Sequence, residues 1–420
     1  MKPKYGNLDC AFVLQTLYLC TANQTTMTNY HPSALPNSRI DVADVLRGIA
    51  IGGIVLIHFI EHLNFYDFPE PSSPLMASID KGVWDTVFFL LAGKMYAVFS
   101  LLFGLSLFIQ HDNQAQKGVD FRPRFVWRMV LLMMFGILDL LFFNGDILFL
   151  YAVCGLLVLP LVRASDKLVA GIAIFLALQP VEIASIVVGL FNPGAAPLNL
   201  GTGALFGAIM PAQQSGSFLD VARADLIYGL PVNFTWAIEN GRMTQTIFLF
   251  LAGMLIGRRR LLYDENGNVD FWKKVLVISA VALAVILPLI PLTSGCGTPI
   301  IRKSLTVMLT MWRNLAMMLI IISGIVLLFY RTRFGGSLKI LAPYGKMSLT
   351  HYIGQSVVGA LLFYGWGFGL YKYCGHTVSL LMGVVLVTVQ CLFSHWWLRN
   401  HRRGPLEQLW SNATWLGAEK

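Results

Sequence analysis

Long apolar runs alternate with short polar segments along most of this 420-residue chain. A helix needs about 20 predominantly apolar residues to cross a bilayer, and that length divides the chain into about ten runs. They lie at 43–61, 83–109, 126–143, 147–163, 168–190, 243–257, 274–292, 306–330, 347–370 and 377–398. The pattern predicts an all-α fold, a polytopic integral membrane bundle of about ten transmembrane helices.

The longest polar interruption covers about 191–242, and no internal repeat is visible. We therefore expect a single transmembrane domain over 39–415 with this interruption outside the cytoplasm, preceded by an N-terminal cytoplasmic segment over 1–38. Within that segment, "AFVLQTLYLC" is too short to span and lacks a cleavage pattern. This leaves two interpretations, a genuine N-terminal segment or a mis-assigned start, in which 1–26 is an extension and Met27 begins the protein.

Lys and Arg gather in alternate connecting segments, as the positive-inside rule describes for cytoplasmic loops. The basic clusters fall at 39–47, 117–128, 163–167, 258–274, 331–339 and 399–403. The 62–81 loop instead carries Asp67, Glu70 and Asp80. The alternation predicts that both termini are cytoplasmic, with Arg47 near the inner end of the first helix and His58 near its outer end.

Composition agrees with a membrane protein, because 56% of residues are hydrophobic, 13% are charged and the mean hydropathy is +0.65. The net charge of +9 does not indicate nucleic-acid binding, since the cations sit in short clusters between apolar runs. Six cysteines are too few and too scattered for a disulfide framework or a cysteine-based zinc site. Cys296 and Cys374 fall in predicted outer loops, which leaves one bridge between them open.

Ionisable side chains inside membrane spans are costly, and by default they mark a functional site. Asp85, Asp146 and Arg242 stand at span ends, where an interfacial charge is the simpler interpretation. Those placed within the predicted spans are Arg47, His58, Lys94, Asp139, Glu182, Arg313 and His351.

Arg47 and His58 have a spacing that suggests two roles on one helix. Eleven residues of α-helix advance about 16 Å and rotate about 1100°, so the two side chains share a face at opposite depths. Arginine holds phosphate through a bidentate fork, and neutral imidazole can remove a proton from a hydroxyl. The plainer interpretation is a positive-inside anchor and an interfacial histidine.

The segment "HFIEH", from His58 to His62, also has the spacing of a zinc hydrolase. Two imidazoles four apart on one helical face, with Glu61 beside them, can bind Zn²⁺ and supply a base. A catalytic site needs a third protein ligand, and the motif stands at a membrane boundary where His and Glu are ordinary. We expect no metal, and a zinc-dependent membrane hydrolase remains a minor alternative.

Several blocks resemble, in order, the signatures of the YeiB-like bacterial inner-membrane family. They are "RIDVADVLRGIAIGGIVLIH", "KMYAVFSLLFGLSLFI", "FFNGDILFLYAVCGLL", "FLAGMLIGRRRLL", "GKMSLTHYIGQSVVGALLFYGWGFGL" and "RRGPLEQLWSNATW". That family is similar to the transmembrane acyltransferase superfamily, which includes heparan-α-glucosaminide N-acetyltransferase and bacterial polysaccharide O-acetyltransferases. The latter share an Arg and a His separated by ten residues on their first helix, the spacing of Arg47 and His58.

The resemblance implies a multi-pass protein of the bacterial inner membrane that moves an acyl group from acyl-CoA, acetyl-CoA above all, to an acceptor of the cell envelope. The chain also departs from the pattern of many YeiB-like members, which carry Asn at the position of His58, His at that of Asp139 and Asn at that of His351. The base of the polysaccharide acyltransferases is thus present here although many closer relatives lack it.

We therefore predict an acyltransferase with a cytosolic acyl-CoA donor and an extracytoplasmic glycan or lipid-linked acceptor. Its partners are these two molecules and the lipid bilayer, and an oligomer is left open. The expected catalytic residues are His58, with Asp139 or Asp146 orienting its imidazole. The expected acyl-CoA contacts are Arg47, Lys94, Arg122, Arg124 and Arg128. The expected acceptor contacts are Glu61, His62, Glu182, Arg313, His351 and Gln355.

Three of these assignments have structural alternatives. Asp146 follows the turn signal Asn144-Gly145 and could simply cap the next helix. His351 and Gln355 lie on one side of a helix, where such side chains often join membrane helices. The main functional rival is a transporter or flippase without covalent chemistry, because buried charges and Gly-rich segments suit alternating access equally well.

Overall fold

The computed structural model describes residues 39–265 and 267–416, and these are all helical or irregular, without a strand. The predicted start at residues 1–26 lies outside the described residues. The principal helices are α2 (Asp41–Ile60), α3 (Pro74–Leu90), α4 (Met95–Ala115), α5 (Arg122–Leu140), α6 (Leu148–Val158), α7 (Asp166–Ala177), α8 (Pro180–Phe191), α9 (Thr202–Ser215), α10 (Phe218–Ala224), α11 (Leu230–Glu239), α12 (Arg242–Arg258), α13 (Asn268–Leu292), α14 (Pro299–Arg331), α15 (Gly335–Leu338), α16 (Ala342–Lys346), α17 (Ser348–Phe363), α18 (His376–Asn400) and α19 (Pro405–Thr414). The all-α prediction is confirmed for this part of the chain.

Fewer helical segments meet the length and hydropathy expected of a membrane span than the predicted ten. Within the described residues, five helical segments are long and apolar enough to cross a membrane, or six if the bent pair α7 and α8 counts as one. The predicted spans at 126–143, 147–163, 243–257 and 347–370 correspond to α5, α6, α12 and α17, which are helical but short or charged. The apolar pattern therefore located the helices correctly, and length alone overstated how many of them qualify as spans.

Two predicted spans are interrupted by residues with a left-handed backbone. The 83–109 run breaks between α3 and α4 at Gly93, whose φ is +81°. The 168–190 run breaks at Gln179 with φ 59°, and α7 and α8 meet there at 47°. Positive φ cannot be continued in a right-handed helix, so each run becomes two helices.

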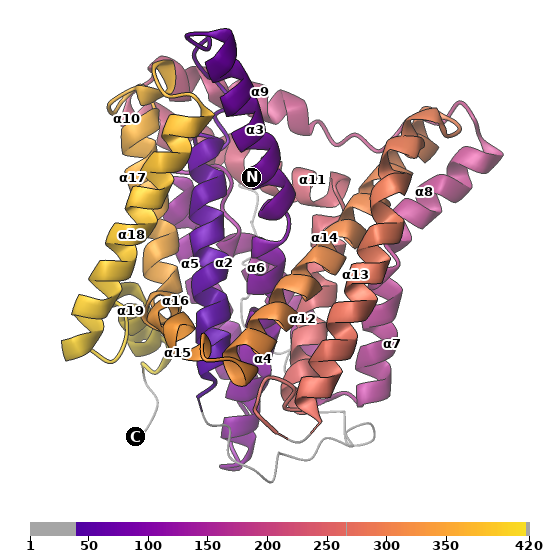
Figure 1. The fold of residues 1–420 in the computed structure, drawn as a ribbon, viewed down its shortest axis with the longest axis vertical. Helices are drawn as coiled ribbons and strands as arrows, with labels where there is room; N and C mark the ends of the chain where they lie inside the picture. Colours follow the sequence, from indigo (N-terminus) through magenta and orange to yellow (C-terminus); the bar gives the residue numbers. More distant parts are fainter. Residues whose placement is uncertain (1–38, 266, 417–420) are drawn as a thin grey trace, which may run out of the picture.

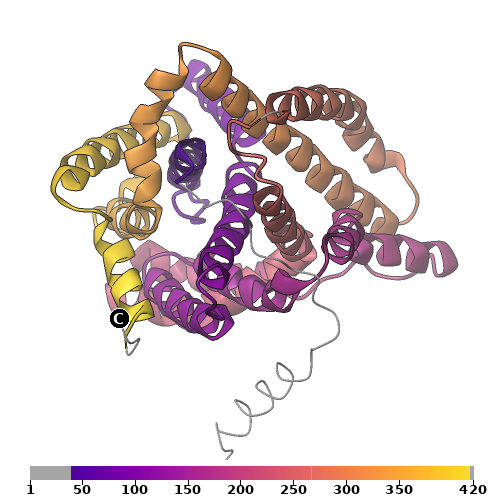
Figure 2. The ribbon, with the colours of Figure 1, turned by 90° about the horizontal axis from the view of Figure 1, so that it is seen from below.

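Helix α2 lies at the centre of the bundle and carries the core (Figure 1). It packs against α4, α16, α17 and α18, and the view from below shows it surrounded by other helices (Figure 2). In its most apolar stretch 78% of residues are buried inside the protein, against 6% for α13. Helix α13 therefore presents its apolar surface outward, as expected for a lipid-facing helix.

Helices α4 and α12 approach closely through glycine. A Cβ added at Gly104 would collide with the carbonyl oxygen of Phe250, and one at Gly253 would collide with that of Leu101. Small residues at helix contacts allow such close backbone packing in membranes. This contact fixes the start of α12, and with it Arg242, beside the first residues of α4.

The predicted interruption at 191–242 is itself largely helical, because it contains α9, α10 and α11. Helices α9 and α10 lie at the upper end of the molecule in Figure 1 and pack against each other. The start of α2 and the C-terminal helix α19 lie at the lower end, together with the end of α4. Arg39, Arg258 and Arg331, from three of the predicted basic clusters, lie at or next to the lower ends of α2, α12 and α14 in Figure 1.

The bridge considered between Cys296 and Cys374 is not formed. Both cysteines are free, and the Cys374 thiol instead lies 3.9 Å from the sulfur of Met382. No covalent link therefore ties these two loops together.

Candidate active site between two cavities

Helix α2 ends abruptly just after His58. His62, Leu63 and Asn64 have φ values of 49°, 56° and 61°, a run of left-handed residues that are not glycine. The amide of Leu63 donates to the carbonyl oxygen of His58 at 2.7 Å, which closes the helix end. Such a conformation is costly and persists where the surrounding structure requires it. The half-buried His58 thus lies in the last turn of α2, and the backbone beyond that turn leaves the helical conformation.

A polar contact and two aromatic rings hold the His58 imidazole. Nδ1 lies 3.1 Å from Nε2 of Gln355 on α17, which joins the first helix to the last quarter of the chain. The ring centroid lies 4.6 Å from that of Phe143 and 6.2 Å from that of Tyr352. With Nδ1 occupied by Gln355, Nε2 is the nitrogen left for a substrate.

The zinc interpretation of "HFIEH" loses its geometric basis here. It requires a continuous helix through His62, but α2 ends at Ile60. Both ring nitrogens of His62 are engaged, Nδ1 with the carbonyl oxygen of Asp67 at 3.2 Å and Nε2 with the Ser379 hydroxyl at 2.7 Å. Among the described residues, no group of three His, Cys, Asp or Glu side chains is arranged to hold a metal ion. His62 therefore joins the end of α2 to α18.

The larger of two cavities, about 700 Å³, opens beside His58. Glu61 also lines it, and its carboxylate accepts a hydrogen bond from the Tyr66 hydroxyl at 3.0 Å. The opposite wall comes from α12 and α14, with Arg242, Arg313 and the buried Asn314. Such a volume holds a small-molecule acceptor. Of the predicted acceptor contacts, Glu61 and Arg313 line this cavity.

Asp139 and Asp146 do not contact His58. Asp146 accepts the backbone amides of Leu148 and Phe149 at 3.0 and 2.9 Å, so it caps α6, the alternative that the turn signal allowed. Asp139 is fully buried on α5, and neither of its carboxylate oxygens has a hydrogen-bond partner. The side chain that positions the imidazole is Gln355, which we expected to contact the acceptor.

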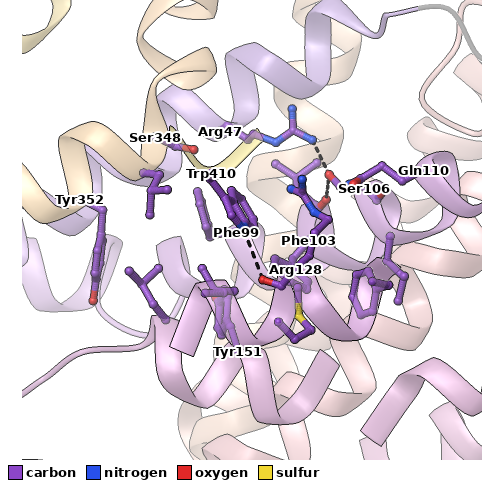
Figure 3. Close-up of a pocket in the computed structure, with 17 residues that line it drawn as sticks. Arg47, Phe99, Phe103, Ser106, Gln110, Arg128, Tyr151, Ser348, Tyr352 and Trp410 are labelled. Carbon is purple, nitrogen blue, oxygen red and sulfur yellow. Dashed lines mark hydrogen bonds between the residues drawn. The ribbon is translucent and has the colours of Figure 1, made fainter. Parts of the chain in front are cut away.

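The smaller cavity, about 190 Å³, lies at the opposite end of α2 around Arg47 (Figure 3). Arg47 forms an ion pair with Asp44 at 2.8 Å and donates to the Ser106 hydroxyl at 2.7 Å. Arg128 faces the same cavity, and its guanidinium lies 3.9 Å above the ring of Trp410 on α19. The indole N–H of Trp410 donates to the Arg128 carbonyl oxygen at 3.2 Å. Two of the five cations predicted to bind acyl-CoA therefore share this cavity.

The other three predicted acyl-CoA contacts lie elsewhere. Arg122 pairs with Asp120 at 2.8 Å. Arg124 donates to the carbonyl oxygens of Thr414 and Leu416 at 2.9 and 3.2 Å, so it holds α19 against α5. Lys94 is buried behind the wall of the larger cavity, where it donates to the carbonyl oxygen of Phe88.

Among the described residues, Tyr352 alone lines both cavities. It is 3% exposed on α17, and its hydroxyl accepts the backbone amide of Ile147 at 3.1 Å. The ring therefore stands between the arginine-lined cavity and the one beside His58. Nothing in the local sequence pattern around Tyr352 shows that two cavities meet there.

Two further predicted acceptor contacts do not reach the larger cavity. His351 is buried and its Nε2 lies 2.6 Å from the Ser394 hydroxyl, which joins α17 to α18 as the packing interpretation stated. Glu182 is buried near Gly241, the residue before Arg242, and does not line the cavity. Sequence inspection set Arg242 aside as an interfacial charge, and the cavity includes it.

Comparison with known proteins connects both sides of this site to described families. Residues 39–199 match the catalytic region of heparan-alpha-glucosaminide N-acetyltransferase, and residues 256–417 match the family described as protein of unknown function DUF418. Arg47, His58 and Arg128 lie in the first region. Tyr352 and Gln355 lie in the second. The candidate site is thus assembled between the two matched regions.

Relatives extend over nearly the whole chain. YxaH of Bacillus subtilis is 27% identical over 93% of this chain and 97% of its own length. YeiB of Escherichia coli is 27% identical over 88% and 95%, and a 39.9 kDa protein encoded 3′ of an amylase gene in Bacillus acidopullulyticus is 24% identical over 91% and 96%.

The fold and these matches define a helical membrane protein whose first half is related to a membrane acyltransferase. The chain is similar to YeiB-like proteins over nearly its whole length.

Proposed function

We propose that this protein is an integral-membrane acyltransferase that moves an acyl group, with acetyl as the first candidate, from cytosolic acyl-CoA to an extracytoplasmic glycan or envelope acceptor. The single observation that carries the proposal is the pair of cavities that meet at Tyr352, one lined by Arg47 and Arg128 and the other by His58. A donor entering from one end and an acceptor entering from the other would meet at this ring.

The smaller cavity suits the donor end. Coenzyme A carries about four negative charges on its phosphates, and guanidinium groups hold phosphate oxygens through charge-assisted hydrogen bonds. Its volume of about 190 Å³ is too small for the whole cofactor, so the nucleotide would remain at the arginine-rich face. Only the narrow, uncharged pantetheine arm would pass along the cavity toward Tyr352. Helix α19 would lie beside the entrance of this cavity, because its Trp410 lines the cavity.

His58 would act as the general base from the other side. Its Nε2 would take the proton of an acceptor hydroxyl or amine as the acceptor atom attacks the thioester carbonyl carbon. The carbon–sulfur bond then breaks and the acyl group stays on the acceptor. The protonated His58 passes its proton to the CoA thiolate. Reactants and products balance without an additional reagent.

This role requires Nε2 of His58 to be the unprotonated nitrogen. An amide presents oxygen on one side and NH₂ on the other, and rotating the Gln355 amide by about 180° exchanges them. The amide oxygen then accepts Nδ1–H, which leaves the lone pair on Nε2. In the other orientation Nε2 of Gln355 faces Nδ1, and Oε1 is buried without a partner.

The test is donor binding by the purified protein in nanodiscs. Acetyl-CoA should raise the midpoint of thermal unfolding and be hydrolysed slowly, and Arg47→Gln should weaken both effects. Arg122→Gln is the matched control, because Arg122 is a nearby cation that pairs with Asp120 away from the cavity. No shift and no hydrolysis in the wild-type protein would refute the proposal and favour a transporter. An acyl group missing from the glycans or lipids of a deletion strain would then identify the acceptor.

A further inference from the structure

The larger cavity contains more positive charge than the protein neutralises. Arg242 and Arg313 line it, and Lys94 lies just behind the wall. Among residues 39–265 and 267–416, no carboxylate lies within ion-pair distance of any of the three. A cation removed from water without a counterion is costly, especially within a membrane. The described part of the protein therefore provides no ion-pair partner for these cations.

The contacts of the three cations support this description. Arg242 lies over the rings of Tyr96 and Trp236, with its guanidinium carbon 4.1 and 4.9 Å from their centroids. Its Nε is buried and has no hydrogen-bond partner. Aromatic faces attract a cation but accept none of its directed N–H bonds as a carboxylate or phosphate would. Donor capacity is therefore left on Arg242.

Arg313 and Lys94 make only weak neutral contacts. Arg313 reaches the side-chain oxygen of Asn314 at 3.2 and 3.4 Å, and Lys94 reaches the Phe88 carbonyl oxygen at 3.3 Å. Two carboxylates also line the cavity. Glu61 accepts the Tyr66 hydroxyl and interacts electrostatically with Arg242 from beyond ion-pair distance, so it offsets one positive charge. The exposed Asp85 pairs with Lys81, which leaves the charges of Arg313 and Lys94 without a carboxylate from the described residues.

We infer that the larger cavity is an anion-binding site and that the acceptor is an anionic hydroxyl or amino compound, bound through a phosphate or carboxylate by Arg242 and Arg313. The anion site itself does not depend on the proposed function, but the identification of the bound anion as the acceptor does. Lys94 adds long-range attraction from behind the wall. The bound anion would leave the acceptor's nucleophile on the His58 side of the same cavity.

The test uses glycerol 3-phosphate and glycerol, which share hydroxyl groups and differ in charge. Radiolabelled glycerol 3-phosphate should bind the wild-type protein in neutral-lipid nanodiscs, and glycerol should not compete. Binding should weaken about tenfold or more in Arg242→Gln and in Arg313→Gln, because each variant loses a charge-assisted hydrogen bond. Arg302→Gln is the matched control, since Arg302 is an exposed cation on the same helix as Arg313.

A second measurement does not depend on any variant. Wild-type binding of glycerol 3-phosphate should weaken as salt is raised. Equal binding of glycerol, or an equal loss in Arg302→Gln, would overturn the anion site. Loss of glycerol 3-phosphate binding in phosphatidylglycerol nanodiscs would show that the bound anion is a lipid headgroup, and persistence would show a soluble or glycan source.

Acetyl-CoA binding keeps this inference distinct from the proposed function. If Arg242→Gln and Arg313→Gln weaken acetyl-CoA as much as glycerol 3-phosphate, and the two compete, the cavity holds donor phosphates and the acceptor assignment is wrong. If acetyl-CoA does not bind at all but glycerol 3-phosphate does, the acyltransferase proposal fails and the anion site stands. If acetyl-CoA binds and glycerol 3-phosphate does not, the anion site is refuted and the acyltransferase proposal stands.

Discussion

Gln355 Nε2 lies 3.1 Å from Nδ1 of His58, across 297 positions of sequence. The contact connects the region matching the acetyltransferase catalytic domain with the region matching DUF418. One ring nitrogen is thereby fixed and the other is directed to the larger cavity. A positioning residue of this kind acts through the histidine and need not touch the substrate.

Replacing Gln355 should therefore affect turnover more than donor binding. Gln355→Leu removes the hydrogen bond that selects the tautomer, and we expect kcat to fall about tenfold, the equivalent of one such bond. Gln355→Glu keeps an acceptor for Nδ1–H and should retain more activity while moving the pH–rate profile. Steady-state acyl transfer over a range of pH measures both. An unchanged profile in Gln355→Glu would assign Gln355 to packing alone.

His58 itself should affect only the chemical step. His58→Ala removes the proton acceptor, so kcat should fall by roughly 10²–10⁴-fold with little change in the KM for acyl-CoA. His58→Asn is the sharper variant, because it keeps hydrogen bonding and approximate size while losing basicity. Rapid-quench measurements at saturating donor separate the two parameters. Full activity in His58→Asn would show that another group is the base.

Replacing Arg47 should mainly change the KM for acyl-CoA, whereas replacing His58 should mainly change kcat. Arg47→Ala removes a contact expected before and during reaction, so it should raise the KM for acyl-CoA about tenfold and leave kcat nearly unchanged. The measurement needs a fold check, because Arg47 also pairs with Asp44. Arg122→Gln provides the baseline for losing a neighbouring cation. A selective fall in kcat would place Arg47 nearer the reacting atoms than proposed.

Glu407 offers a test by pH. Its carboxylate accepts the backbone amides of Leu349 and Thr350 at 2.7 and 3.1 Å, which fastens α19 to the start of α17. Burial raises the pKa of Glu407 above its ordinary value of 4.5, although the hydrogen bonds oppose that shift. A raised carboxyl pKa means that the folded state holds the proton more tightly. This stabilisation is complete below pH 4.5 and is lost as the pH rises through the folded-state pKa.

We expect Glu407→Gln to remove that part of the pH dependence. Gln keeps an acceptor for the two amides and cannot ionise, so the midpoint of thermal unfolding of the wild type relative to Glu407→Gln should fall as pH rises above 4.5. The exposed pair Asp270 and Lys273 supplies the control, through Asp270→Asn. A wild-type midpoint that stays constant relative to that of Glu407→Gln, or falls relative to it on acidification, would contradict the assignment.

Orientation in the membrane is the remaining prediction. A reporter fused to the C-terminus should lie in the cytoplasm, and one inserted in the 62–81 loop should lie outside, because basic clusters mark cytoplasmic segments. Cysteine accessibility in intact cells checks the same point independently. The reverse labelling would put His58 on the side of the donor and remove the basis for the proposed direction of transfer.

Much of the fold follows from local pattern, and little of the site does. Apolar runs show where helices form, because each run must be covered by protein or lipid, and a helix pairs its own backbone polar groups there. They do not show that the backbone turns left-handed at Gln179 or His62, which shortens or bends the helices. Arg47 and His58 stand out in the sequence because both lie on one helix at a known spacing, and each lines a cavity.

The misassigned residues involve contacts between distant segments. Asp146 was expected to orient His58, but its oxygens are used locally to cap α6. Gln355 reaches His58 only because α17 packs against α2, and Arg242 shares the larger cavity with His58 only because α12 packs against α4. A single sequence does not show how far apart two side chains lie in the fold. It therefore identifies polar residues within apolar runs but not which of them contact one another.

The boundary at Tyr352 has an electrical consequence. A water-filled cavity takes the potential of the solution that it meets, so two cavities extending from opposite ends of α2 leave only the layer around this phenol to sustain a transmembrane voltage. Each elementary charge driven through such a layer changes energy by about 2.3 kcal/mol per 100 mV. A neutral acyl group escapes that term, whereas a proton or a phosphate does not. Tyr352 would then act as an insulator, keeping ions on their own sides while a short uncharged thioester passes.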